Sequence, residues 1–426
     1  MKKKLKVIEL FAGVGGFRLG LEGDKNGNSS TSGYTEKLNS IFKVVWSNQF
    51  EPSTPTKQWA SDIYINQFGK ENHSNDDLVE ISKKPAKLIK KELPDCDVLV
   101  GGFPCQDYSV ANSLRTAKGL LGKKGVLWYA IEGILDKLGR KKPKYLILEN
   151  VDRLLKSPAN QRGKDFAIML ASLNNLGYVV EWRVINAADF GFPQKRRRVF
   201  ILAYLGKKNK NIFDNEFDAI EKKKEDFFSI SNNLKEISKD FGKGDKVSKF
   251  LNSGFCVNGN ITTKSLVYQS PKKTTLLKNI LVPESKVGEE FWIVKNDLGA
   301  WKKGKEGGTK QRTSYRDGKP HPYKYSEGSM KFPDDLNSPS RTIITSEGGK
   351  YPSRFKHIID PKNDEKYRRL TPVELERLNM FPDDHTKFEG ITNSKRAFLM
   401  GNALVVGVVE KIGLCIMKYD KKNKKK

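Results

Sequence analysis

The sequence is poor in the side chains that build metal centres and disulfide frameworks. Only four cysteines and four histidines occur among 426 residues. The cysteines are Cys96, Cys105, Cys256 and Cys415. Their spacing matches neither a zinc site nor a set of disulfides, and scattered thiols are typical of a reducing compartment. No apolar run is long enough to span a bilayer, and Lys6 and Glu9 stand where a signal segment would be apolar. We therefore expect a cytoplasmic protein that binds no metal.

Acidic residues are also too few to balance the basic ones. The chain has 78 Lys and Arg against 50 Asp and Glu, which gives a formal net charge of +28. Such an excess favours a polyanionic partner, most plausibly nucleic acid, although a lysine-rich composition without any partner would give the same charge. The length allows two or three domains.

The first apolar stretch ends in a glycine turn. Residues 7–11 read as a strand, the next five residues contain Gly13, Gly15 and Gly16, and an amphipathic helix follows. Glycines at this place allow a ligand to lie against bare backbone at the start of the helix. The third glycine of the dinucleotide fingerprint would fall on Arg18, which disfavours a nicotinamide dehydrogenase. The turn favours a nucleoside cofactor without phosphates, such as S-adenosylmethionine.

A second apolar strand at 42–46 leads to residues suited to a nucleoside. Gln49 offers a polar side chain for a ribose, with Glu51 as the alternative. Phe50 offers an apolar face for an adenine, although it suits the protein core equally well. Further on, the carboxylate of Asp77 suits the adenine amino group. These residues extend the predicted cofactor site.

A third strand, residues 97–100, passes through two glycines into Pro104 and Cys105. Proline fixes φ just before the cysteine, and ligands of open α/β sheets bind beyond the carboxyl ends of the strands. Cys105 is therefore a candidate nucleophile. The alternative is a small buried hydrophobic residue.

Two later strands add a carboxylate and two arginines. Residues 144–148 form a buried strand that ends at Glu149, on the same sheet edge as Cys105; the alternative for Glu149 is a capping residue. The strand that opens at 194 carries Arg196 and Arg198 two positions apart, hence on one face. The apolar spacing predicts helices over 126–138 and 165–176 between these strands.

Six motifs, in this order and with this spacing, resemble the C5-cytosine DNA methyltransferase family of bacterial restriction–modification systems. They are ELFAGVGG at 9–16, GGFPCQ at 101–106, ENV at 149–151, PQKRRR at 193–198, RLTPVE at 369–374 and GNALVV at 401–406. The resemblance covers nearly the whole chain except its middle.

The resemblance implies an α/β, Rossmann-like S-adenosylmethionine-dependent methyltransferase fold with a smaller, irregular, mostly β target-recognition domain. The catalytic and cofactor-binding domain would span 1–205, the target-recognition domain 206–360, and an interdomain helix with the return of the chain 361–426. Within the middle region the spacing favours a helix over 227–241.

The resemblance also implies roles for individual residues. Cys105 would attack C6 of a flipped-out cytosine, Glu149 would hold a proton at N3, Arg198 would contact the base carbonyl, and Arg196 lies on the same face. The predicted cofactor-binding residues are Phe11, Gly13, Gly15, Gln49, Phe50, Asp77, Pro104, Leu127 and Asn402. The family usually has Glu at the position of Gln49, so the ribose contact is weakened here or passes to Glu51.

The predicted DNA-binding residues are Gln106, Ser109, Arg341 and Thr342. The implied partners are double-stranded DNA and a cognate restriction endonuclease, and we expect a monomer. Two alternatives stay open: an RNA cytosine methyltransferase, against which the long variable region argues, and a catalytically idle DNA-binding regulator, against which Cys105 and Glu149 argue.

Overall fold

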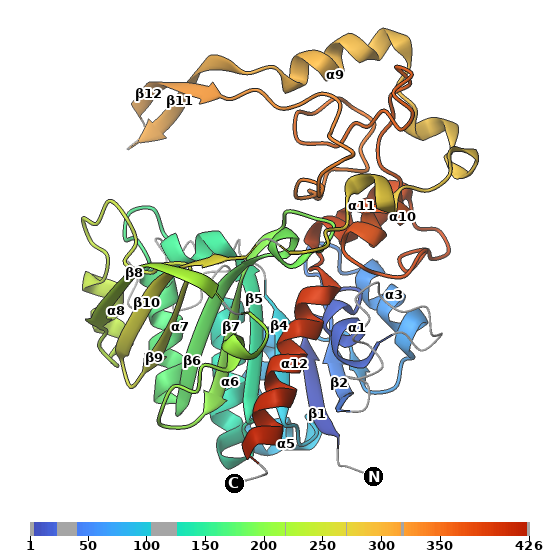
Figure 1. Ribbon diagram of the computed structural model, residues 1–426. Helices are drawn as coiled ribbons and strands as arrows, with labels where there is room; N and C mark the ends of the chain where they lie inside the picture. The colour runs from blue at the N-terminus through green and yellow to red at the C-terminus, as the bar shows by residue number, and fades with distance from the viewer. Residues whose placement is uncertain are drawn as a thin grey trace.

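The computed structural model describes residues 4–23, 41–103, 126–217, 219–269, 271–316 and 319–423 (Figure 1). Four of the predicted site residues, Pro104, Cys105, Gln106 and Ser109, lie outside the described residues. The fold of the remaining chain decides how the other predicted residues are arranged.

A ten-stranded sheet forms the centre of the larger part, in the order β3-β2-β1-β4-β5-β7-β6-β9-β10-β8. Its strands are β1 (Leu5–Leu10), β2 (Phe42–Asn48), β3 (His73–Ser74), β4 (Val98–Gly102), β5 (Tyr145–Val151), β6 (Tyr178–Asn186), β7 (Arg197–Leu205), β8 (Ala219–Ser229), β9 (Ser253–Val257) and β10 (Asn260–Tyr268). The first five strands pair in parallel, and β7 is antiparallel to both β5 and β6. Strand order reverses between β1 and β4, where α/β folds bind their ligands. The predicted Rossmann-like methyltransferase fold is confirmed.

The central strands are apolar throughout because both faces of the sheet are covered. Val7, Val98 and Val100 pack into one apolar cluster, whereas Ile8 and Leu99 pack into the cluster on the other face. One face carries α1 (Gly16–Glu22), α3 (Trp59–Phe68) and α12 (Val406–Asn423). The other face carries α4 (Leu78–Lys83), α5 (Ala86–Glu92), α6 (Val126–Leu138) and α7 (Lys164–Asn175).

The C-terminal helix returns to the first element of the chain. A Cβ atom added to Gly20 on α1 would lie 2.6 Å from Cβ of Val409 on α12, so the two helices pack in direct contact. The stretch Asn393–Lys422 is long and apolar enough to cross a membrane by length and composition, but 83% of its most apolar window is buried inside the protein. Its apolar character is thus accounted for by packing against α1 and the sheet.

The sheet continues beyond Leu205, where the sequence places the end of the first domain. β9 pairs with β6, and β10 joins β9 to the edge strand β8. The helix predicted over 227–241 is wrong in its first part, because residues up to Ser229 belong to β8 and only α8 (Leu234–Asp240) is helical. Phe228 explains the difference: it packs against Phe250 at a centroid distance of 5.4 Å, which favours a strand with one apolar face.

A smaller, irregular part stands beside the edge at which β1, β4 and β5 end (Figure 1). Its regular elements are α9 (Leu298–Lys305) and a separate two-stranded ribbon of β11 (Gly308–Arg316) and β12 (Lys319–Glu327), and the chain then continues through α10 (Pro372–Leu378) and α11 (Asn393–Asn402). The 3-10 helices are η3 (Gly139–Lys141), η4 (Asp152–Lys156), η5 (Ala187–Phe190), η6 (Ile212–Asn215), η7 (Leu277–Ile280), η8 (Glu284–Lys286), η9 (Glu289–Phe291) and η10 (Lys295–Asp297).

Candidate active site

The turn between β1 and α1 is built on residues with positive φ. Phe11, Gly13 and Gly15 have φ values of 52°, 55° and 88°. A Cβ atom added to Gly13 would meet nothing within 4 Å, whereas one added to Gly15 would lie 2.2 Å from Cε2 of Phe68. Gly13 therefore presents open backbone, and Gly15 is required by close packing.

Gln49 reaches this turn directly. Its Oε1 accepts a hydrogen bond of 2.8 Å from the backbone N–H of Gly13. On the far side of the turn, the ring Nε2 of His385 donates to the carbonyl of Val14 at 2.7 Å. Two segments more than 300 residues apart thus fix the same turn, and the part played by His385 was not predicted from the sequence.

A buried polar network lies under the turn. Glu9 is fully buried; its Oε2 accepts from the hydroxyl of Tyr64 at 2.9 Å and its Oε1 from the backbone N–H of Arg18 at 3.3 Å. Arg18 in turn pairs with Glu22 at 3.0 Å and lies over the ring of Phe68. Burial raises the pKa of Glu9 to about 7, against the opposing effects of Tyr64 and Arg18. Sequence analysis missed this network, although Glu9 is a polar residue inside an apolar strand.

The other predicted cofactor residues differ in their exposure and in their partners. Phe50 and Leu127 are half-buried and Asn402, at the end of α11, is exposed. Asp77 caps α4, where its carboxylate accepts from the N–H of Val79 at 2.9 Å. Glu51 pairs with Lys395 of α11 at 3.4 Å. The carboxylates of Asp77 and Glu51 are therefore already engaged within the protein.

Glu149 and Arg198 meet at the carboxyl edge of the sheet. The Nε of Arg198 lies 2.9 Å from Oε1 of Glu149, and both side chains are mostly buried. Gly102 pairs with Glu149 in the sheet, and a Cβ atom at Gly102 would lie 3.2 Å from Oε2 of Glu149. The carboxylate therefore lies against the backbone that leads toward Cys105. Burial raises the pKa of Glu149, while the charges of Arg198 and Arg196 lower it.

Asn150 fixes the beginning of the same turn. Its side-chain amide donates to the carbonyl of Phe103 at 2.9 Å, and it is itself buried. The sequence identified this residue only as part of the motif at 149–151. Its role is to anchor the last described residue before Cys105.

Arg196 is 2% exposed and bonded to backbone. Its Nη2 donates to the carbonyl of Gly401 at 2.7 Å and its Nη1 to that of Ile343 at 3.3 Å. Burial lowers the pKa of Arg196, and the charge of Arg198 acts in the same direction. Both Arg196 and Arg198 therefore lie close enough to Glu149 to affect its pKa. Arg196, however, connects three segments of the chain, and we regard it as a positioning residue.

Gln194 also connects separate segments of the chain. Its amide donates to Oδ1 of Asn379 at 2.9 Å, and its Oε1 accepts from the N–H of Ile343 at 2.9 Å. Beside it, the N–H of Lys195 donates to the carbonyl of Ser340 at 2.7 Å. Residues 340–343 are thereby fixed along the start of β7.

Two residues of this segment, Arg341 and Thr342, were predicted to bind DNA, but both have partners within the protein. Arg341 makes a two-point ion pair with Asp334, at 2.6 and 3.1 Å, and also donates to the carbonyl of Phe355. The hydroxyl of Thr342 donates to the carbonyl of Lys195. Both side chains are used within the protein, a possibility that their spacing in the sequence did not reveal.

The motif at 369–374 also has a structural role. Thr371 and Glu374 form a reciprocal capping box at the start of α10. Glu374 pairs with the fully buried Arg368 at 2.7 Å and accepts from the N–H of Val282 at 3.0 Å. The motif thus connects α10 to the irregular part of the chain.

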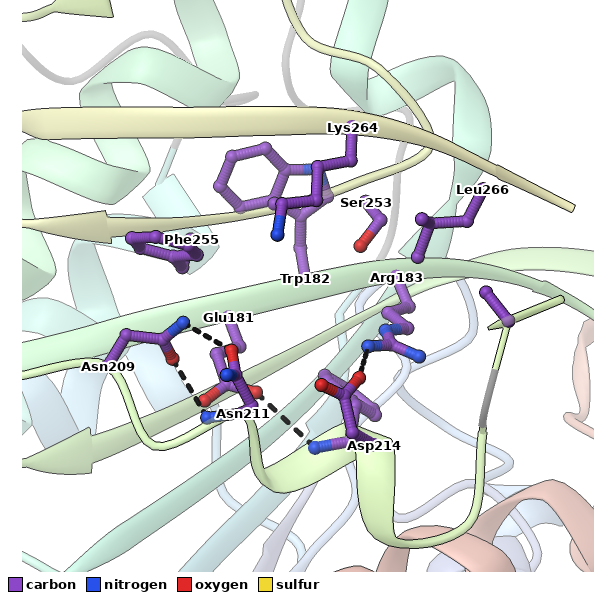
Figure 2. A pocket seen from close by; sticks show the side chains of 13 residues that line it. Glu181, Trp182, Arg183, Asn209, Asn211, Asp214, Ser253, Phe255, Lys264 and Leu266 are labelled. Carbon is purple, nitrogen blue, oxygen red and sulfur yellow. Dashed lines mark hydrogen bonds and ion pairs between the residues drawn. The ribbon is translucent and has the colours of Figure 1, made fainter. Parts of the chain in front are cut away.

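A cavity of about 330 Å³ lies on the outer part of the sheet, and no predicted site residue lines it (Figure 2). Its wall includes Glu181 and Arg183 of β6. Glu181 accepts from the N–H of Ile212 at 3.1 Å. Figure 2 shows Arg183 paired with Asp214. These charges hold η6 against the sheet. Within the described residues, no group of three or more His, Cys, Asp or Glu side chains is placed to hold a metal ion.

Comparison of the sequence and of the fold with known proteins identifies the family. The profile of the family described as C-5 cytosine-specific DNA methylase matches residues 5–418. The chain belongs to this family. It is accordingly an enzyme of the DNA (cytosine-5-)-methyltransferase class.

Individual relatives agree with this assignment. The chain is 44% identical to the type II methyltransferase M.Sau3AI of Staphylococcus aureus over 98% of its own length and 96% of that protein. It is 36% identical to M.HaeII of Haemophilus aegyptius over 48% of its length and 52% of that protein. Among solved structures, the Dnmt2 methyltransferase of S. pombe matches with a TM-score of 0.59 and 18% identity, covering 98% of this chain and 99% of that one. The methyltransferase EhMeth of Entamoeba histolytica matches with a TM-score of 0.58 and 17% identity over both whole chains. These two structures support the fold.

Proposed function

We propose that this methyltransferase transfers a methyl group from S-adenosylmethionine to C5 of a cytosine within a short duplex DNA sequence, through a covalent bond between Cys105 and C6. The observation that carries the proposal is the position of Glu149 and Arg198. Glu149 lies against the backbone of Gly102, which leads toward Cys105 at the carboxyl edge of the sheet, and Arg198 pairs with this carboxylate. The family assignment supplies the reaction class.

The glycine turn fits a nucleoside cofactor. Gly13 leaves open space beside its backbone, and Gln49, with the half-buried Phe50 next to it, borders the same turn. S-adenosylmethionine supplies an electrophilic methyl group when it is bound. We assign its binding to Phe11, Gly13, Gly15, Gln49, Phe50, Pro104, Leu127 and Asn402. Asp77 contributes by fixing the start of α4, because its carboxylate caps the N-terminus of that helix.

Cys105 activates the base. Addition of its thiolate to C6 pushes electrons toward C5, which is otherwise a poor nucleophile. Glu149 holds a proton at N3 and so stabilises the enamine that forms. A carboxyl group whose pKa is raised by burial suits this task, and Arg198 orients it through the 2.9 Å ion pair while contacting the base carbonyl. Once C5 carries the methyl group, its proton passes to a water molecule, and the electron pair left behind expels the thiolate of Cys105.

The cytosine must leave the duplex to reach this edge. Extrusion costs a few kcal/mol of stacking and pairing, which contacts with phosphates offset. The net charge of +28 supplies cations for such contacts. By similarity to the type II methyltransferases, we further propose that the protein acts as a monomer in the cytoplasm, as the modification partner of a restriction endonuclease with the same recognition sequence.

Radiolabelled S-adenosylmethionine tests the proposal. Duplex DNA and a tRNA pool are each incubated with the wild-type protein and with the Cys105→Ala variant. We expect label at C5 of duplex cytosine with the wild-type protein only. DNA that contains 5-fluorocytosine should also form a stable adduct with the wild-type protein, because fluorine cannot leave as a proton. Label on RNA alone would favour the RNA methyltransferase, and no label on either would favour a DNA-binding regulator. Transfer by Cys105→Ala would exclude attack by this thiol.

A further inference from the structure

Arg341 and Thr342, the two described residues that were predicted to read DNA, are half-buried and bonded to other parts of the protein. Arg341 is paired with Asp334, and Thr342 is bonded to the backbone of β7. Side chains that read base edges must instead be presented to solvent. The ribbon of β11 and β12 meets this condition.

The described side chains of the ribbon are exposed on both of its faces. Its strands pair in antiparallel register from Gly308↔Glu327 to Arg316↔Lys319, apart from the ten-stranded sheet. The described side chains are exposed at Thr309, Gln311, Thr313, Pro320, His321, Pro322, Tyr323, Lys324 and Ser326. In Figure 1 the ribbon extends away from the rest of the irregular region. A two-stranded ribbon without a covered apolar face has little stability of its own, which is consistent with a surface completed by a partner.

The base of the ribbon is held firmly. Arg354 pairs with Glu327, the last residue of β12, and donates to the carbonyl of Gly328 at 2.6 Å. On the β11 side, the buried ammonium group of Lys305 donates to the carbonyl of Lys356 at 2.6 Å and lies 3.7 Å from Asp334. The ribbon is therefore presented from a rigid support, which lowers the entropic cost of ordering it on a ligand.

The basic residues of the ribbon indicate a polyanionic ligand. Residues 308–327 contain five basic residues, Lys310, Arg312, Arg316, Lys319 and Lys324, against two acidic ones. A two-stranded β-ribbon has the width that the major groove of B-DNA admits. Resting on the proposed function, we infer that the β11–β12 ribbon enters the major groove of the substrate duplex and reads base edges there.

The register puts only one of the five basic residues, Lys324, on the face of Gln311; the other four occupy the alternate positions. We assign the face of Gln311 to the bases and the basic residues of the alternate positions to the phosphates. Gln311 is paired with Lys324, with Thr309↔Ser326 and Thr313↔Pro322 next to it on the same face. This face carries an amide, hydroxyl groups and an ammonium group, which are the groups that bond base edges; an amide of this type pairs with adenine through two hydrogen bonds. Tyr323, which is 44% exposed, is one position away and therefore on the opposite face.

Two variants on the reading face and one on the opposite face test the inference. The methylated context is first mapped for the wild-type protein by bisulfite sequencing of plasmid DNA. The value of kcat/KM is then measured on a duplex with that context and on duplexes with one changed base pair outside the target cytosine. Gln311→Ala should lower discrimination at one position by roughly tenfold or more. Lys324→Ala should lower it likewise, or reduce the slope of log affinity against log salt by about 1.

Two controls accompany these variants. Tyr323→Ala removes an exposed side chain from the same ribbon and should discriminate as the wild type does. Lys43→Ala removes an exposed cation near the start of β2, at the opposite end of the sheet, and should leave the salt dependence unchanged. Wild-type discrimination in both Gln311→Ala and Lys324→Ala, or its loss in Tyr323→Ala, would overturn the inference. Failure of the proposed function is distinguishable, since it would show as no transfer to duplex DNA by the wild-type protein.

Discussion

Two glycines of the same turn should respond differently to one added methyl group. Gly13 and Gly15 both have positive φ, but only Gly15 has a neighbour within contact distance. Gly13→Ala should weaken binding of the cofactor because the new Cβ would project into the open space that we assign to the nucleoside. Gly15→Ala should instead destabilise the fold, because the new Cβ would overlap the ring of Phe68, which is held between this turn and the guanidinium of Arg18.

The magnitudes follow from the two geometries. A left-handed conformation costs an alanine about 1–2 kcal/mol, which is the whole expected loss of folding free energy for Gly13→Ala. Overpacking at Gly15 adds about 1–3 kcal/mol, so the total loss there is about 2–5 kcal/mol. For cofactor affinity we expect at least a tenfold loss in Gly13→Ala, which corresponds to about 1.4 kcal/mol.

Urea unfolding and calorimetric titration with S-adenosylmethionine separate the two effects. Gly177→Ala serves as the matched control: Gly177 also has positive φ, 86°, and open space, but it lies between α7 and β6, away from the turn. It should lose stability as Gly13→Ala does and keep its affinity. The reasoning is refuted if Gly13→Ala binds the cofactor as tightly as Gly177→Ala, or if Gly15→Ala is as stable as Gly13→Ala.

Three further predictions concern titration and helix packing. Because the folded state raises the pKa of Glu9 from 4.5 to about 7, the wild-type protein should lose stability as pH rises between these values. The free energy of unfolding should fall by roughly 3 kcal/mol over this pH range. The urea midpoint of Glu9→Gln, which has no carboxyl group at this position, should not show this fall. Arg198→Met should move the basic limb of the pH profile of kcat to higher pH, since the charge of Arg198 lowers the pKa of Glu149; an unmoved limb would exclude Glu149 as the titrating group. Gly20→Ala should destabilise the protein by about 0.5–2 kcal/mol through contact with α12, whereas Gly133→Ala in α6, which meets nothing within 4 Å, should stabilise it by about 0.5–1 kcal/mol. Equal effects of the two in thermal unfolding would contradict the packing argument.

Local patterns were sufficient for the elements that carry the chemistry. The helix predicted over 126–138 coincides with α6, and the predicted strands around residues 7, 98 and 146 are β1, β4 and β5. Apolar runs between glycine turns predict buried parallel strands because covered sheets exclude polar residues from both faces. A mostly β middle region was predicted, but the individual strands β8–β10 and their place in the main sheet were not. β8 contains Lys222, Lys223 and Lys224 in sequence, a composition that does not alternate as a half-buried strand should.

The sequence by itself therefore determined the family, the order of the elements and the edge at which Glu149 and Arg198 meet. The tertiary structure alone decided which charged side chains are engaged within the protein. Arg196 bonds to carbonyls 147 and 205 positions away. Arg341 is paired with Asp334, beside Lys305. The spacing of residues in a chain specifies strands and helices, because these depend on near neighbours. It does not specify partners that only folding brings together, such as Asp334 for Arg341. Because of these partners we propose the exposed ribbon, and not the segment around Arg341, as the part that faces the DNA.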